Sequence, residues 1–149
     1  MNMILMEISQ KQLSVFATKQ PAKKNLRHTL TEGERIMTTL IDEIVKLNLG
    51  SIELLALVTS TSYEVVFYAT VNGKKYQSNA LTAEGLFDIL KMDEFYSKVA
   101  TIIRNASNFK SDSMNIVTVN SSATIKWEYA ERNCRIYPIK KNWKNSFEN

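Results

Sequence analysis

Apolar residues recur at intervals of three and four between residues 32 and 48, which is the spacing of one face of an α-helix. The residues that would form this face are Ile36, Met37, Leu40, Ile41, Ile44, Val45 and Asn48. Thr31 and Glu34 fit a capping box at the start of the helix, and Gly50 fits a stop after its last turn. The pattern therefore predicts a helix over residues 32–48.

Three extended segments follow this helix. Residues 51–59 are almost continuously apolar, as in a central strand, and residues 63–71 are rich in the aromatic and β-branched side chains that suit a sheet. Asn72 and Gly73 both tolerate a positive φ, so they predict a type I′ turn into a strand over residues 74–77. Because the connections are short, the three strands should form an antiparallel meander.

A second helical pattern covers residues 83–106 and predicts one long helix, capped by Thr82, with a kink or break near residues 91–93. The residues that would form its apolar side are Leu86, Ile89, Leu90, Val99, Ile102, Ile103 and Ala106. A second hairpin is expected after it, with strands over residues 114–120 and 123–130.

The two ends of the chain give weaker patterns. Residues 3–18 predict one or two short strands, and residues 19–30 predict a basic loop around Pro21. Residues 134–137 are a candidate extension of the sheet, and Pro138 suits the first turn of a short terminal helix. The residues that would dock this helix repeat at intervals of four: Ile139, Trp143 and Phe147.

Antiparallel strands separated by helices predict an α+β fold. We expect a single antiparallel sheet, made of the meander and the hairpin, with two main helices packed on one face of it and a short C-terminal helix. The 149 residues fit one domain, residues 1–149, because a chain of this length buries enough surface to need no disulfide or metal.

Composition excludes several classes of protein. Apolar residues make up 44% and charged residues 23% of the chain, which excludes a disordered or collagen-like protein. Cys134 is the single cysteine, so a disulfide framework is excluded. The N-terminus is a poor signal peptide, and no segment has the ~20 apolar residues that span a bilayer. We therefore expect a cytoplasmic protein that has no membrane partner.

Few residues are candidates for catalysis. His28, the single histidine, lies in the basic loop and is more typical of a solvated side chain than of a general base. Arg132 and Arg135 flank Cys134 and could lower the pKa of its thiol, but a half-buried structural cysteine at a strand start is the more frequent role. No spacing of metal ligands and no glycine-rich phosphate loop is visible. We expect no enzymatic activity, metal or cofactor.

The net charge of +4 conceals an uneven distribution. Residues 11–27 contain five bases and no acid, and residues 132–144 contain the same balance. Between them, residues 32–64 contain six acids and two bases. Either the acidic middle or the basic ends could therefore meet a partner of opposite charge.

The order and character of the elements over residues 32–131 resemble the YezG-like immunity proteins, which protect bacteria against their own polymorphic nuclease toxins. The resemblance is carried by Leu40-Ile41-Asp42-Glu43-Ile44-Val45-Lys46, Glu53-Leu54-Leu55-Ala56-Leu57-Val58, Tyr63-Glu64-Val65-Val66-Phe67-Tyr68, Asn72-Gly73 and Ile125-Lys126-Trp127-Glu128-Tyr129. Members of that family tend to be acidic, whereas this chain is basic overall. An immunity protein of another family, such as those of contact-dependent growth inhibition systems, is therefore an alternative, because these families share the role more than a sequence.

The resemblance implies an immunity protein, or antitoxin, that binds and neutralises a cognate bacterial toxin by blocking its active site or substrate groove. The toxin would be a nuclease domain. Opposite charge would accelerate encounter, and desolvated aromatic side chains would slow dissociation. The candidate toxin-binding residues are Asp42, Glu43, Glu53, Glu64, Tyr63 and Tyr68, although each would also fit an ordinary solvated face.

The alternative is a small protein that binds single-stranded nucleic acid with its basic N- and C-terminal segments. Bases would hold phosphates and aromatic side chains would stack on nucleobases. The candidate residues are Arg132, Arg135, Lys140, Lys141, Trp143 and Lys144. Trp143 also fits the docking edge of the last helix, so the sequence leaves both functions open, as it does the oligomeric state.

Overall fold

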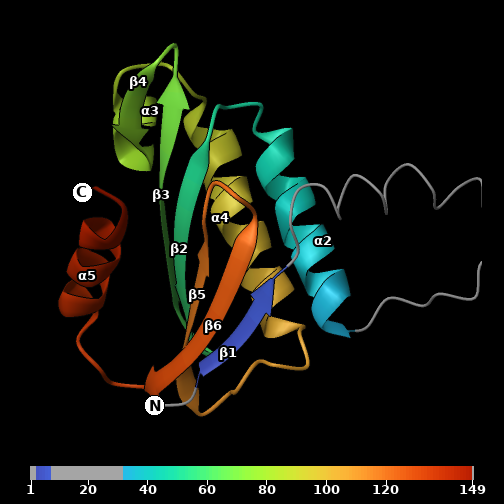
Figure 1. Cartoon of the computed structure of the whole chain (residues 1–149). Helices are drawn as coiled ribbons and strands as arrows, with labels where there is room; N and C mark the ends of the chain where they lie inside the picture. Colours follow the sequence, from blue (N-terminus) through green and yellow to red (C-terminus); the bar gives the residue numbers. More distant parts are fainter. Residues whose placement is uncertain (1–2, 8–31, 149) are drawn as a thin grey trace, which may run out of the picture.

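The computed structural model describes residues 3–7 and 32–148, which form an α+β fold around one six-stranded antiparallel sheet (Figure 1). The strand order is β1-β6-β5-β2-β3-β4. The strands are β1 (Met3–Glu7), β2 (Ile52–Val58), β3 (Tyr63–Val71), β4 (Lys74–Gln77), β5 (Ser113–Val119) and β6 (Thr124–Glu131). The helices are α2 (Glu32–Lys46), α3 (Ser78–Ala83), α4 (Ile89–Arg104) and α5 (Ile136–Glu148). The predicted fold class, with its meander and hairpin, is confirmed.

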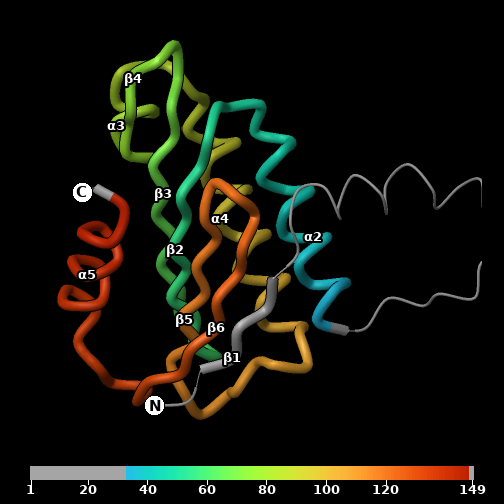
Figure 2. Tube along the Cα trace, in the orientation of Figure 1, coloured from blue at the N-terminus to red at the C-terminus, as the bar shows by residue number. Residues whose placement is uncertain are grey.

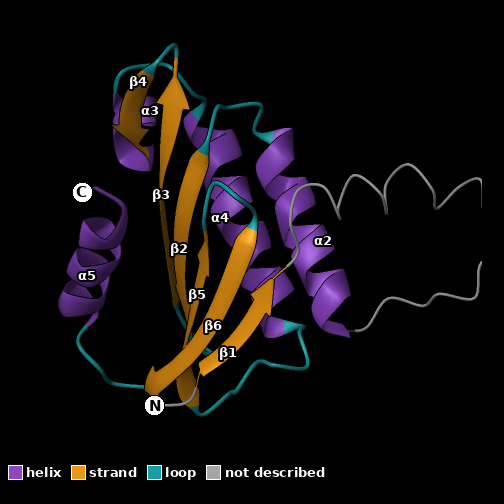
Figure 3. Cartoon of the chain, viewed as in Figure 1, coloured by secondary structure: helices purple, strands orange, loops and turns teal. Residues whose placement is uncertain are grey.

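The main core lies between the sheet and the helices α2 and α4, which cover one of its faces (Figure 3). Leu40 of α2 and Ile103 of α4 are fully buried there. They belong to one apolar cluster with Phe67 of β3 and Trp127 of β6. Burial of such large side chains contributes about 1.5–3 kcal/mol each, so this layer supplies most of the hydrophobic stabilisation.

A second, smaller core lies on the opposite face, beneath α5. It contains buried side chains of β2, β3 and β5 together with half-buried side chains of α5, among them Leu55, Val66, Ile116, Ile139 and Trp143. The docking edge predicted for the terminal helix is confirmed. The two main helices share one face as expected, and α5 covers the other, because the strand β2 is apolar on both faces and needs a cover on each side.

The long helix predicted over residues 83–106 is wrong. The chain forms the short α3 and then α4, and the break falls at residues 84–88, where Gly85 has a φ of 73°. Asp88 caps α4 by accepting a hydrogen bond from the Lys91 amide at 3.1 Å, whereas the hydroxyl of Thr82 donates to the Asn79 carbonyl. As a consequence, three residues expected on the buried side are exposed: Leu86, Ile89 and Leu90.

The other predicted connections include one turn that the structure confirms and one segment that it does not. Asn72 and Gly73 have φ values of 53° and 79°, which confirms the type I′ signature of their turn. The predicted sheet extension over residues 134–137 is wrong, because the chain after β6 turns around the end of the sheet and enters α5 (Figure 2). Predictions for residues 8–31, including the loop over 19–30, lie outside the described residues.

Candidate functional site

Two sets of candidate residues that are distant in the sequence meet on the α5 face of the sheet. Glu64 of β3, a candidate toxin-binding acid, forms an ion pair with Lys140 of α5, a candidate nucleic-acid-binding base. Both side chains are only about one-third exposed. The pair therefore fixes α5 to the sheet and reduces the charge that either residue offers to a partner.

Aromatic candidates from both sets also pack between α5 and the sheet. The ring centroid of Tyr68 lies 5.8 Å from that of Trp143 and 5.5 Å from that of Phe147. Lys75 Nζ lies 5.1 Å from the Phe147 centroid, and Lys144 Nζ lies 5.9 Å from that of Tyr68. The rings pack against one another and carry cations on their remaining faces, so their main role is to hold α5.

Glu53 belongs to the same face, since it pairs in register with Tyr68. Its carboxylate accepts a hydrogen bond from the Ser121 amide at 3.1 Å and so fixes the β5–β6 turn. Tyr63 lies on the other face, where the Arg104 guanidinium is 5.7 Å from its ring centroid. The structure thus places Glu53, Glu64 and Tyr68 on one face of the sheet and Tyr63 on the other.

The other two acidic candidates lie on α2, in the opposite layer. Glu43 accepts a hydrogen bond from Lys46 at 3.0 Å and lies 3.8 Å from Lys98 of α4, so it connects the two helices. Asp42 is exposed. Val45, which the helical pattern placed on the packed side, is 68% exposed. An open hollow of about 500 Å³ begins beside Val45 and is also lined by Ile41, Ile44 and Leu49.

The remaining basic candidates surround the start of α5. Arg132 donates a hydrogen bond to the Thr61 hydroxyl at 3.2 Å. Arg135 and Lys141 are exposed, and neither forms an ion pair with any described residue. Arg135, Lys141 and Lys144 thus lie on the α5 side, whereas the exposed Asp42 lies on the side of α2.

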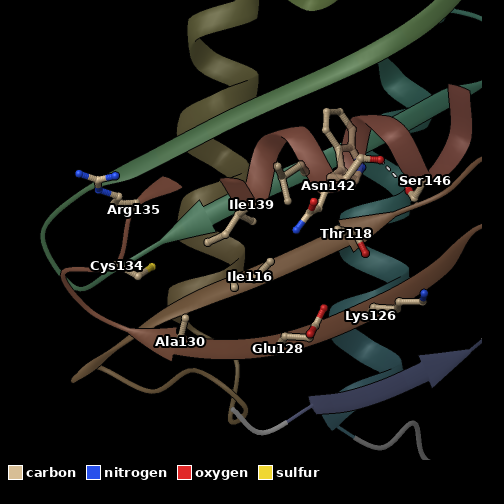
Figure 4. A pocket seen from close by; sticks show the side chains of 12 residues that line it. Ile116, Thr118, Lys126, Glu128, Ala130, Cys134, Arg135, Ile139, Asn142 and Ser146 are labelled. Carbon is tan, nitrogen blue, oxygen red and sulfur yellow. Dashed lines mark hydrogen bonds between the residues drawn. The ribbon is translucent and has the colours of Figure 1, made fainter. Parts of the chain in front are cut away.

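A groove of about 490 Å³ separates α5 from β5 and β6. Figure 4 shows Thr118, Glu128 and Lys126 on the strands and Ile139 and Asn142 on the facing side of α5. The other lining residues are Leu55, Ile116, Ala130, Cys134, Arg135, Trp143 and Ser146. Most of the lining is apolar, with a few polar groups between, which is the composition of ligand pockets.

Several groove residues were missed by the sequence analysis as site residues, among them Thr118, Lys126, Glu128 and Asn142. The alternation in β6 does place Lys126 and Glu128 on one face. Without knowledge that α5 covers this side of the sheet, such charged residues indicate a face exposed to solvent. The continuous apolar character of β2, which indicates burial on both faces, was the available signal.

Of the two candidates for reactive chemistry, the structure describes Cys134. His28 lies outside the described residues. Cys134 is half-buried at one end of the groove and belongs to the turn before α5, so its expected place at a strand start is wrong. Within residues 3–7 and 32–148, no three His, Cys, Asp or Glu side chains are grouped to hold a metal ion. Across the same residues, no helix has the length and apolar character to cross a bilayer.

Comparison with models of protein families, with curated proteins and with solved structures found no match for this chain. The resemblance to YezG-like immunity proteins therefore stays a prediction, based on the residues quoted for it and on the order of the elements.

Proposed function

We propose that this chain is an immunity protein that binds and neutralises a cognate bacterial toxin, a nuclease domain, without turnover. The observation that carries the proposal is the surface of α2, where the exposed acid Asp42 lies one helical turn from the exposed Val45. The hollow beside Val45 has both polar and apolar lining, and its apolar part at Ile41, Ile44 and Leu49 would accept an apolar side chain of the toxin. A carboxylate beside such an anchor suits a basic, nucleic-acid-binding partner.

The other acids are weaker candidates for this contact. Glu53 and Glu64 fix the β5–β6 turn and α5, and Glu43 bridges α2 and α4. Their substitution would disturb the fold as well as a partner. Asp42 forms no hydrogen bond or ion pair with the described residues, so its charge is the one most available to a toxin.

The experiment is co-purification with the product of the adjacent reading frame, followed by a nuclease assay of that product with and without this chain. We expect a stoichiometric complex and loss of nuclease activity. Asp42→Lys should raise the Kd at least about tenfold, because like charges at an interface repel. Asp112→Lys in the α4–β5 loop makes the same charge change elsewhere and should leave the Kd within about twofold.

Two outcomes would count against the proposal. If the adjacent product does not bind, or keeps its activity when bound, neutralisation is excluded for that pair. If Asp42→Lys and Asp112→Lys bind equally well, the interface lies away from α2.

A further inference from the structure

We propose that the groove between α5 and the β5–β6 hairpin binds single-stranded nucleic acid, with one base in the groove and phosphates at its two ends. This site lies on the opposite face of the sheet from α2 and is independent of toxin binding. Its volume of about 490 Å³ lies within the range of about 300–1,000 Å³ typical of small-molecule pockets, so one nucleotide unit can enter it.

The walls of the groove suit a flat, partly polar ring. Ile116 and Ala130 provide an apolar floor on the strands, and Ile139 and Trp143 provide the apolar wall on α5. Asn142 from α5 and Thr118 from β5 bring hydrogen-bonding groups to the same space (Figure 4). A base would thus find apolar surface for its faces and polar partners for its edge.

Glu128 gives the groove a preference among bases. Its carboxylate lies between the two ends of the groove and has no ion-pair or hydrogen-bond partner among the described residues. A carboxylate accepts hydrogen bonds from the exocyclic amino group of cytosine or adenine, and thymine has no such group. We therefore expect cytosine and adenine to bind more tightly than thymine.

The ends of the groove carry the charge that phosphates require. Lys126 lies toward one end and Arg135 toward the other, and neither forms an ion pair with the described residues (Figure 4). Lys141 adds a further exposed cation on α5, again without an ion pair in the part of the chain that the structure describes. The excess of bases around the groove disfavours a second copy of this chain, whose α5 would bring the same positive charge. A polyanion is the complementary occupant.

A single strand is favoured over a duplex by the position of the polar groups. Thr118, Glu128 and Asn142 line the groove beneath α5, so a base must leave its stack to reach them. A duplex would contact only the outer cations such as Lys141.

The first test is fluorescence anisotropy with labelled oligo(dA), oligo(dC), oligo(dT) and a duplex of equal length. We expect oligo(dA) and oligo(dC) to bind at least about threefold more tightly than oligo(dT) or the duplex. Two phosphate contacts predict a slope of about −1.4 for log K against log salt concentration. Lys126→Glu should weaken binding at least about tenfold, and Lys91→Glu, an equal charge change on the opposite layer, should not.

The second test uses Cys134, the single cysteine of the chain, which lines the groove. Bound oligo(dA) should slow alkylation of its thiol by a maleimide several-fold, and Lys126→Glu should abolish the protection. Unfolding in urea provides the check that Lys126→Glu and Lys91→Glu are equally well folded.

Several results would overturn the inference. No binding of any strand, equal binding by K126E and K91E, or unchanged alkylation of Cys134 would remove the site. Equal affinity for oligo(dA), oligo(dC) and oligo(dT) would remove the role of Glu128. If AMP or CMP protects Cys134 as well as a strand does, the occupant is a free nucleotide and the strand is excluded. None of these results bears on toxin binding at α2, and failure of toxin binding leaves this groove unaffected.

Discussion

At the scale of single residues, Asn115 is the polar group with most structural consequence. It is fully buried, and its side-chain amide donates hydrogen bonds to the carbonyls of Val58, Lys110 and Ser113. Its oxygen accepts from the Lys110 amide at 2.9 Å and from the Trp127 indole at 3.2 Å. One side chain thus joins the α4–β5 loop, two strands and the largest core residue.

Replacing Asn115 with leucine should lower the free energy of unfolding by about 2–4 kcal/mol, because the Trp127 indole N–H and several backbone groups would lose their partners. Urea unfolding measures the change. Asn133→Leu, in the exposed turn before α5, is the matched control and should change the free energy by less than about 0.5 kcal/mol. Equal effects of the two substitutions would contradict the role of Asn115.

Gly50 is required for close approach and not for its expected role as the helix stop. Asn48, with a φ of 55°, reverses the chain after α2, whereas a Cβ on Gly50 would lie 2.0 Å from the carbonyl oxygen of Thr70. Gly50→Ala should therefore cost about 1–3 kcal/mol, since backbone must move to relieve the clash. The measurement is the thermal unfolding midpoint, with the exposed Ser51→Ala as control. A midpoint equal to that of the control would show that the backbone at Thr70 moves away from the added Cβ at little cost in free energy.

At the scale of elements, the strands were predictable and the helix boundaries were less so. Alternation and the Asn72–Gly73 turn located β3 and β4, because both signals are local. Residues 84–88 were not recognised as a break because apolar periodicity does not distinguish a packed leucine from an exposed one such as Leu90. Asp88 followed three residues later by Lys91 lacks the full capping-box pattern, so the start of α4 gave little signal.

The helix α5 is an element whose docking depends on few side chains. Trp143→Ala would remove the ring that packs on Tyr68 and part of the wall formed with Ile139. Amide hydrogen exchange over α5 should accelerate at least about tenfold, while β2 keeps its protection. Tyr137→Ala on the outer face, where Tyr137 is 70% exposed, should leave both rates unchanged. Parallel loss of protection in β2 would instead mean that α5 and the sheet unfold as one unit.

At the scale of the whole molecule, the site was much less predictable than the fold. Glu64 and Lys140 are 76 positions apart, and nothing local indicates that they meet. The sequence assigned them to competing surfaces, whereas folding pairs them and leaves Asp42, Arg135 and Lys141 as candidates that form no ion pair with any residue the structure describes. Composition could reveal that opposite charges were present, but only the folded arrangement of the helices determines which of them are neutralised.

The global stability should fall in alkaline solution through two tyrosines. Burial raises the pKa of the Tyr96 and Tyr129 hydroxyls, so the folded state keeps both protons after the unfolded chain begins to lose them. Their contribution is complete below about pH 10 and is lost as the pH rises through the folded pKa values, because there the unfolded state binds fewer protons. Urea unfolding between about pH 8 and 11 measures this loss.

Tyr129→Phe isolates one of these groups. The substitution removes the hydrogen bond that the hydroxyl donates to the Asn108 carbonyl at 2.6 Å, which should cost about 1 kcal/mol near neutral pH. Above about pH 10 its stability should decline less steeply than that of the parent chain. The exposed Tyr137→Phe should keep the parent slope. A Tyr129→Phe slope equal to the parent slope would exclude Tyr129 as a source of the decline.

The pairing of β1 with β6 determines the order in which the sheet can be completed. Met3 to Glu7 pair with Glu128 to Thr124, so this contact closes a loop of more than a hundred residues, the most expensive closure in the sheet. At a synthesis rate of about 5–20 residues per second, β1 is made roughly 6–25 s before its partner strand is complete. For that interval β1 has no partner strand. When β6 emerges, the outer edge of β6 can pair with whichever copy of β1 reaches that edge first. Two nascent chains on neighbouring ribosomes could therefore exchange their first strands.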